Sequence, residues 1–176
     1  MENISIEYGH EKQCWLDGYD SYTRLFKRKR QIVFTVLFAV IAVLFVEQIV
    51  RDPQYGTGWF CLAICIFMLA VNLLTPHIEK KKIACALDNI KDDRYTITIY
   101  EDRFCVKTVP SGEEAEQIPE TVTLLSDKTL RAVEKQGYYG LFSKTTFCII
   151  PRSGLSEDEN EALGRLVKSI EENRKK

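Results

Sequence analysis

A long apolar run near the N-terminus constrains this chain more than any other feature. Residues 32–46 carry no charge, and Thr35 is their only side chain with a polar group. The Thr35 hydroxyl can donate a hydrogen bond to a backbone carbonyl of its own helix. The run therefore lacks the polar face that a core helix of a soluble protein has. Continued through Val50, the helix reaches about 28 Å, close to the thickness of the membrane hydrocarbon. The run predicts a membrane span. The alternative is an unusually apolar core helix of a soluble protein.

The position of this run argues against a cleaved signal peptide. A signal peptide places its apolar region close to the start and ends at a small-residue cleavage motif. Here a mainly polar segment of 31 residues precedes Ile32, and no such motif follows the run.

A second apolar run, residues 59–74, follows a short polar segment, and Asn72 is its one strongly polar side chain. The segment between the runs contains Pro and Gly and is long enough to turn a helix back on itself. Tyr55 and Trp59 stand where aromatic side chains anchor a span at the membrane interface. The prediction is a hairpin of two transmembrane helices, 31–50 and 59–75, joined by a loop at 51–58.

Basic residues flank both outer ends of the predicted hairpin, whereas Arg51 is the only basic residue in its loop. Lys and Arg flanks stay in the cytoplasm. The sequence therefore predicts that both termini are cytoplasmic. The residues that determine this topology are Lys27, Arg28, Lys29, Arg30, Lys80, Lys81 and Lys82.

Four side chains inside the spans could carry chemistry. Glu47 and Asn72 lie near opposite ends of an antiparallel hairpin and cannot pair with each other. Ionisable groups inside a membrane often belong to an ion or proton path, but these positions favour Glu47 at the interface and Asn72 bonded to a neighbouring helix. Cys61 and Cys65 share a helix face, which would suit the binding of a soft metal or the attachment of a lipid. The favoured interpretation is that both act as small apolar residues that fill space in the packing.

The segment before the first span, 1–30, combines a strand with a helix. The stretch ISIEYG alternates apolar and polar residues, and four aromatic residues then recur at helical spacing: Trp15, Tyr19, Tyr22 and Phe26. This amphipathic helix can lie on the membrane with its basic end near anionic headgroups. It can equally pack on the cytoplasmic domain, and the sequence leaves both arrangements open.

The chain after the second span is predicted to form a juxtamembrane helix, 76–92, and a β-rich domain, 93–176. Alternation in RYTITIYEDRFCVKTV predicts two strands joined by a turn at Glu101 and Asp102. Further strands are predicted at 117–125, 130–134, 138–142 and 145–150, with a hairpin turn at 135–137.

The last predicted element carries the clearest local signal. The residues SEDE at 156–159 match a capping box, in which Ser156 caps a helix and Glu159 reaches back. The predicted fold class is a membrane α-helical hairpin plus an α+β cytoplasmic domain, with a small curved antiparallel sheet closed by this C-terminal helix. The core face of the helix, read from its spacing, is Leu163, Leu166, Val167 and Ile170.

The sequence contains no motif for catalysis, metal binding or cofactor binding. His10 and His77 are its only histidines, and neither zinc-ligand spacing nor a phosphate-binding glycine loop occurs. The six cysteines form no CxxC pair and are expected to be reduced and mostly buried. A net charge of −1 argues against nucleic acid as a partner. We expect a protein that is not an enzyme and uses no cofactor.

One motif leads from the last predicted strand into the capped helix. It reads Phe147-Cys148-Ile149-Ile150-Pro151-Arg152, with Leu155-Ser156 after it and LRAVEKQGYYGLF before it. Together with the two-span layout, it resembles the YcxB-like family of bacterial membrane proteins. The resemblance implies a bacterial inner-membrane protein with a small pleckstrin-homology-like barrel capped by a helix. It carries over no catalytic residue, and it places Pro151 at a strand end and Ser156 at a helix start.

These features lead us to expect a multi-pass inner-membrane protein whose cytoplasmic domain acts in protein interaction or regulation, through a groove or an exposed strand edge. The expected partners are the lipid bilayer and another protein. A lipid-headgroup sensor is an open alternative, although residues 83–176 carry 17 acidic against 14 basic residues. A transporter built as a homo-oligomer of hairpins and an immunity protein are two others.

Overall fold

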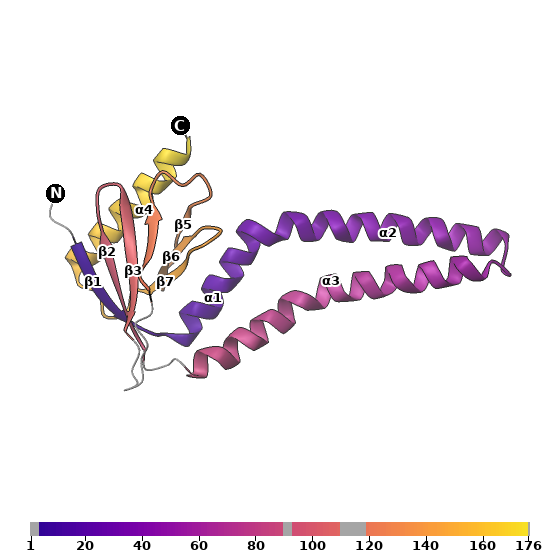
Figure 1. Ribbon diagram of the computed structural model, residues 1–176, viewed down its shortest axis with the longest axis horizontal. Helices are drawn as coiled ribbons and strands as arrows, with labels where there is room; N and C mark the ends of the chain where they lie inside the picture. The colour runs from indigo at the N-terminus through magenta and orange to yellow at the C-terminus, as the bar shows by residue number, and fades with distance from the viewer. Residues whose placement is uncertain (1–3, 90–92, 110–118, 176) are drawn as a thin grey trace. The chain divides into compact units, whose positions relative to one another are not determined.

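The computed structural model describes residues 4–89, 93–109 and 119–175 (Figure 1). Contacts divide the chain into two compact units, which we call the sheet unit (residues 1–19 and 84–176) and the hairpin unit (residues 20–83). The elements in chain order are β1 (Ile4–Gly9), α1 (Lys12–Tyr22), the π-helix η1 (Thr23–Lys27), α2 (Arg28–Arg51), α3 (Gly56–Asn89), β2 (Arg94–Ile99), β3 (Arg103–Val109), β4 (Thr121–Leu124), β5 (Arg131–Glu134), β6 (Tyr138–Phe142), β7 (Phe147–Pro151) and α4 (Glu157–Lys175).

Two antiparallel sheets make up the β structure of the sheet unit, with strand orders β1-β2-β3-β4 and β5-β6-β7. β1 pairs with β2 although residues 10–93 separate them, and Gly9 lies opposite Arg94 at the end of the ladder. Ile6 lies opposite Ile97, and both side chains are fully buried. Because strand side chains alternate between faces, burying this pair fixes the register of β1.

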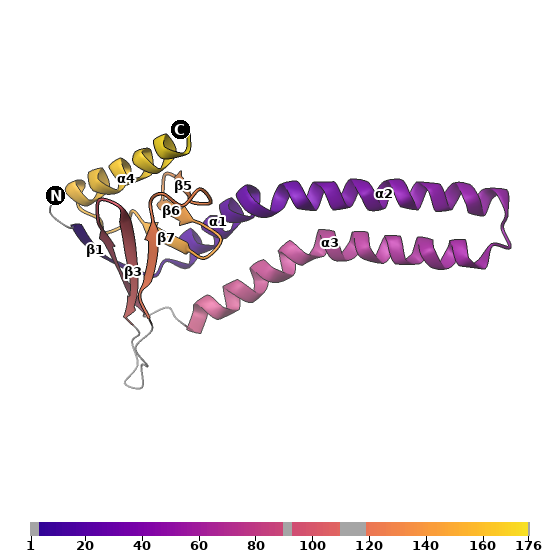
Figure 2. The same ribbon diagram turned by 45° about the horizontal axis from the view of Figure 1, so that its top comes forward.

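The C-terminal helix α4 covers the strands and completes the core of the sheet unit (Figure 2). The prediction of its core face is confirmed, since all four residues are buried. They share the core with Phe104 and Leu141 from the strands and with Leu130 from the β4–β5 connection. The four helix residues are Leu163, Leu166, Val167 and Ile170.

The predicted capping box at the start of α4 is also confirmed. The Ser156 N–H donates to Glu159 Oε2 at 2.8 Å, and the Glu159 N–H donates to Ser156 Oγ at 3.3 Å. Each residue thus satisfies a backbone donor that the first helical turn leaves without a partner.

The first part of α1 packs on the sheets. The Trp15 ring lies 5.7 Å from the Tyr95 ring and 5.6 Å from the Phe147 ring, centroid to centroid. At Gly18, an added Cβ would lie 2.1 Å from Ile149 Cδ1, so only glycine allows this close approach. Of the two arrangements that the sequence leaves open for the predicted helix, the structure shows packing on the domain for its first part, up to Tyr19, whereas residues 20–30 belong to the hairpin unit.

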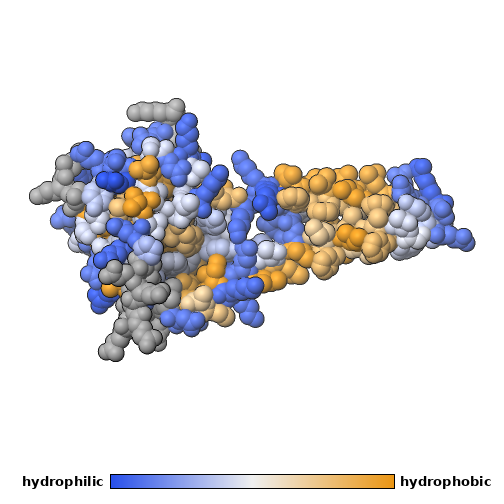
Figure 3. All heavy atoms as spheres, in the orientation of Figure 1, coloured by the Kyte–Doolittle hydropathy of each residue, from blue (hydrophilic) through white to orange (hydrophobic). Residues whose placement is uncertain are grey.

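The hairpin unit holds two helices that are long and apolar enough to cross a membrane, in the helical stretches Lys12–Arg51 and Gly56–Asn89. Only 6% and 11% of their most apolar segments are buried inside the chain, whereas a core helix of a soluble protein is mostly buried. Figure 3 shows apolar side chains along the middle of α2 and α3, with hydrophilic side chains at both ends.

The structure differs from the predicted organisation at three points. Residues 1–19 belong to the sheet unit, so 1–30 is not a separate part. The predicted second span and the predicted helix 76–92 form one continuous helix, α3, which runs through Pro76. The predicted single sheet is two sheets, and the predicted strand residues 117 and 118 lie outside the described residues.

Candidate functional site

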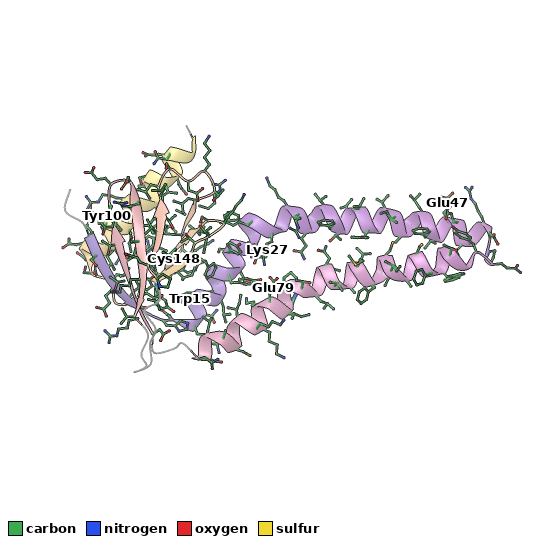
Figure 4. All side chains as sticks on the ribbon, viewed as in Figure 1. Trp15, Lys27, Glu47, Glu79, Tyr100 and Cys148 are labelled. Atoms are coloured by element: carbon green, nitrogen blue, oxygen red, sulfur yellow. The ribbon has the colours of Figure 1, made fainter. Side chains whose placement is uncertain are left out.

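Two of the basic residues predicted to determine topology form ion pairs. Lys27 Nζ lies 2.6 Å from Glu79 Oε2, and Lys80 Nζ lies 2.7 Å from Asp20 Oδ2. Figure 4 shows Lys27 and Glu79 facing each other from η1 and α3. These pairs connect α3 to η1 and to the end of α1, and they partly neutralise the two lysines.

The other five predicted topology residues are exposed, and among the described residues no carboxylate lies within 4 Å of their charged groups. Their charge therefore stays available for headgroups or other anions. The Arg30 guanidinium lies 5.8 Å from the centre of the Phe34 ring. The five residues are Arg28, Lys29, Arg30, Lys81 and Lys82.

The opposite end of the hairpin carries the predicted interface anchors. Tyr55 and Trp59 are 40% and 55% exposed, and Trp59 Nε1 donates to the Pro53 carbonyl oxygen at 3.3 Å. Glu47 forms an ion pair with Arg51 one turn later, at the far end of α2 (Figure 4). This exposed pair gives Glu47 a partner near the C-terminal end of α2, away from the apolar middle of this helix.

Asn72 is bonded to the neighbouring helix, as its sequence position favours. Its Nδ2 donates to the Gln31 carbonyl oxygen at 3.1 Å and to Thr35 Oγ1 at 2.9 Å. In return, Gln31 Nε2 donates to the Asn72 carbonyl oxygen at 3.0 Å. That carbonyl would normally accept from the residue four positions later, which is Pro76 and has no N–H. Gln31 thus satisfies a backbone group that the proline leaves open.

Sequence reasoning missed Gln31, although a signal for its role was present. A proline four residues after a position inside an apolar helix frees one carbonyl, and a polar side chain on the facing helix can then satisfy it. Reading Asn72 and Pro76 together would have directed attention to the polar residues of the first span.

A groove of about 430 Å³ follows this polar contact between the two helices, and we call it the hairpin groove. Its two ends differ in chemistry, since one is charged and the other is apolar and partly aromatic. The lining residues are Thr23, Phe26, Lys27, Arg30, Gln31, Phe34, Phe38, Met68, Val71, Asn72, Thr75, Pro76 and Glu79.

A second groove, of about 770 Å³, lies in the sheet unit beside the end of β4, and we call it the β4 groove. The β2–β3 turn, the β4–β5 connection and the end of α4 form its walls. It combines apolar side chains with charges of both signs. The lining residues are Glu101, Asp102, Leu124, Leu125, Ser126, Asp127, Lys128, Leu130, Arg131, Ile170 and Asn173.

The wall made by the β4–β5 connection is held by Asp127. Its two carboxylate oxygens accept from the Thr129 N–H at 2.7 Å and from the Thr129 hydroxyl at 2.9 Å. The Leu130 N–H donates to the Asp127 carbonyl oxygen at 2.9 Å. These local bonds fix the backbone as an Asx-type turn, so the groove has a preformed wall.

Next to this groove, β4 presents an apolar outer face. Val122 and Leu124 are 54% and 51% exposed, while Thr123 between them is buried and shares a 2.5 Å hydrogen bond with the Thr146 hydroxyl. β4 is the terminal strand of its sheet and pairs only with β3 among the described strands. Its outer edge can therefore accept another extended segment.

The thiols and histidines do not assemble a reactive centre in the described residues. Cys148 is buried and contacts the Tyr8 hydroxyl at 3.2 Å, and burial raises the pKa of its thiol to about 11. Cys65 is buried and Cys61 half-buried in α3. Burial lowers the pKa of His10, while His77 is exposed. No cluster of three or more metal-ligating side chains occurs in the described part of the chain.

Comparison with known proteins found no match among family models, curated proteins or solved structures.

Proposed function

We propose that this chain is an integral inner-membrane protein that crosses the membrane twice and presents its sheet unit to a protein partner in the cytoplasm. The observation that carries the anchoring part is the exposure of two long apolar helices in one hairpin. Exposed apolar surface on this scale is stable in a bilayer and is an aggregation hazard in water.

The place where the helices enter the domain supports a topology with both ends on one side. The chain leaves the sheet at Gly9 and returns at Arg94, and these two residues are cross-strand partners. A segment that starts and ends at neighbouring positions crosses a membrane an even number of times. The basic residues at this end of the hairpin favour the cytoplasmic side.

The β4 groove supports a role in protein binding. An extended peptide that pairs with the outer edge of β4, which has no partner among the described strands, would gain main-chain hydrogen bonds, and its side chains would meet the exposed Leu124. The charged lining residues could then select the polar positions of the peptide. The proposed ligand is an extended segment of another protein with an apolar side chain.

The proposal includes membership of the YcxB-like family and a pleckstrin-homology-like domain. Antiparallel strands followed by one C-terminal helix support it, as does the local structure of the motif. Ile149 and Ile150 are fully buried, and Pro151 ends β7 at the end of the strand order β5-β6-β7. Arg152 bonds Glu134 and the Tyr139 hydroxyl, so the motif has a structural role.

Site-specific photocrosslinking in intact cells tests the protein-binding part. A photoreactive residue in place of Val122 is expected to give one adduct of defined mass, and the same residue in place of Glu161 on α4 should give none. Leu124→Asp should abolish the adduct at position 122. Val109→Asp alters an exposed apolar residue outside the groove and should preserve it. Equal yields at both positions, or an adduct that survives Leu124→Asp, would rule out binding at this groove.

A further inference from the structure

We infer that the hairpin groove binds one anionic phospholipid from the cytoplasmic leaflet, with its phosphate at the Arg30 end and one acyl chain along the apolar end. The inference rests on the proposed insertion of the hairpin in a membrane. It adds a ligand site within the span, separate from the β4 groove.

The charged end of the groove suits a phosphate. Two cations, Lys27 and Arg30, and one carboxylate, Glu79, line it, which leaves one positive charge. Lys27 is paired with Glu79, whereas no described carboxylate lies within ion-pair distance of Arg30. A guanidinium without a carboxylate partner, at the edge of an apolar groove, is a good donor for a phosphate oxygen.

The helix geometry at this end also points to a site. Thr23 lines the groove from the π-helix η1, and its buried hydroxyl has no hydrogen-bond partner among the described residues. π-helical turns inside long helices are frequently found at functional sites.

The other end of the groove suits an acyl chain. Phe34 and Phe38 from α2 face Met68 and Val71 from α3 across it. From Arg30 to Phe38 the helix rises by about 12 Å, which lies within one leaflet of a hydrocarbon layer about 30 Å thick. The groove therefore has the polarity and the depth of a single phospholipid that is anchored at the headgroup level.

A second copy of the hairpin is a weaker fit to the same groove. In a parallel dimer, each copy would bring its own cluster of unpaired cations, Arg28 to Arg30, to the charged end. Like charges close together repel, whereas an anionic headgroup neutralises them. The charge of the groove thus favours a lipid.

Native mass spectrometry of the full chain in detergent can measure this binding. We expect dioleoyl phosphatidylglycerol to bind at least tenfold more tightly than dioleoyl phosphatidylcholine, which has the same acyl chains. Arg30→Gln should weaken phosphatidylglycerol binding about fivefold, the effect of one basic residue near an anionic surface. Lys29→Gln removes the same charge outside the groove lining and should change it less than twofold.

Filling the apolar end provides a second test that leaves the charges in place. Val71→Trp should reduce the binding of both lipids. Equal binding of the two lipids, or equal effects of Arg30→Gln and Lys29→Gln, would overturn the inference. A dimer that excludes lipid and is lost in Val71→Trp would also overturn it, in favour of a second copy.

Extraction of cell membranes with alkaline carbonate separates this inference from the proposed function. A chain that resists extraction but shows no preference for phosphatidylglycerol disproves the lipid site alone. A chain that is released by carbonate contradicts both proposals, because the hairpin is then not inserted.

Discussion

At the scale of single residues, the contact between the two helices depends on a backbone carbonyl that Pro76 leaves without its helical donor. Gln31 Nε2 supplies the missing hydrogen bond to Asn72 O, while Asn72 Nδ2 bonds the facing helix. An unsatisfied backbone group is costly in an apolar environment. The role of Gln31 should therefore depend on the proline.

This dependence predicts a coupled effect of two substitutions. Gln31→Leu should destabilise the hairpin by about 1 kcal/mol, because it leaves the Asn72 carbonyl open. In a Pro76→Ala background the backbone N–H at position 76 can bond this carbonyl, so Gln31→Leu should cost clearly less. Unfolding of the full chain in SDS mixed micelles, followed by helical circular dichroism, measures both costs.

The control for this pair is Gln48→Leu, the same chemical change at an exposed position in α2. It should have little effect in either background. Equal costs of Gln31→Leu with and without Pro76 would show that the freed carbonyl does not explain the role of Gln31.

Residue-level predictions from the sequence succeeded where the cause is local. The placement of Asn72 against a neighbouring helix was predicted from its polarity inside an apolar run. Its partners were not, because facing residues depend on the rotation of two helices about their axes. The acidic partners of Lys27 and Lys80, which are Glu79 and Asp20, were also not predicted, because each pair joins distant parts of the chain.

At the scale of elements, α4 shows how local chemistry starts a helix. Backbone and side-chain hydrogen bonds from Ser156 lower the pKa of Glu159. A carboxylate with a lowered pKa in the folded state stabilises that state above its ordinary pKa. The contribution is lost as the pH falls through the lowered value.

The capping box therefore predicts a pH-dependent stability difference. Ser156→Ala should lower the free energy of unfolding of the sheet unit by about 1 kcal/mol near neutral pH. Glu159→Ala should also destabilise the sheet unit near neutral pH. The difference in free energy of unfolding between this variant and the wild type should shrink as the pH falls below the ordinary glutamate pKa of about 4.5. Urea unfolding of the full chain in detergent, read by Trp15 fluorescence in a Trp59→Phe background, gives these values.

Glu172→Ala is the matched control, since it removes a carboxylate at the other end of the same helix. It should not destabilise the unit, because acids near a helix C-terminus are unfavourable. A Glu159→Ala difference that is constant from pH 7 to pH 3 would contradict the assigned role of the Glu159 carboxylate.

Other elements were less predictable from the sequence. The alternation in ISIEYG indicated a strand, and β1 is that strand, but a short strand does not specify its partner. Its pairing with β2 depends on a contact across residues 10–93. The predicted helices 59–75 and 76–92 form one continuous helix, α3, which runs through Pro76, because Gln31 replaces the hydrogen bond that the proline cannot make.

At the scale of the whole molecule, the hairpin is an insertion in the connection between the first two strands of the sheet unit. The composition of the apolar runs predicted the two helices, whereas the insertion point follows from a non-local pairing that composition does not contain. This insertion explains why residues at both ends of the hairpin contribute to one domain. It also makes the central claim, two crossings with both flanks in the cytoplasm, directly testable.

Cysteine labelling with a membrane-impermeant maleimide tests this claim in bacterial cells. Cys85 is the one exposed native thiol, while Cys61 lies half-buried in the apolar part of α3 and the other thiols are buried. Gln54→Cys places a thiol in the exposed loop between the helices. In intact cells we predict labelling of Gln54→Cys but not of the wild type, whose Cys85 should react only after the membrane is permeabilised. Labelling of the wild type in intact cells, or of Gln54→Cys only after permeabilisation, would contradict the proposed topology.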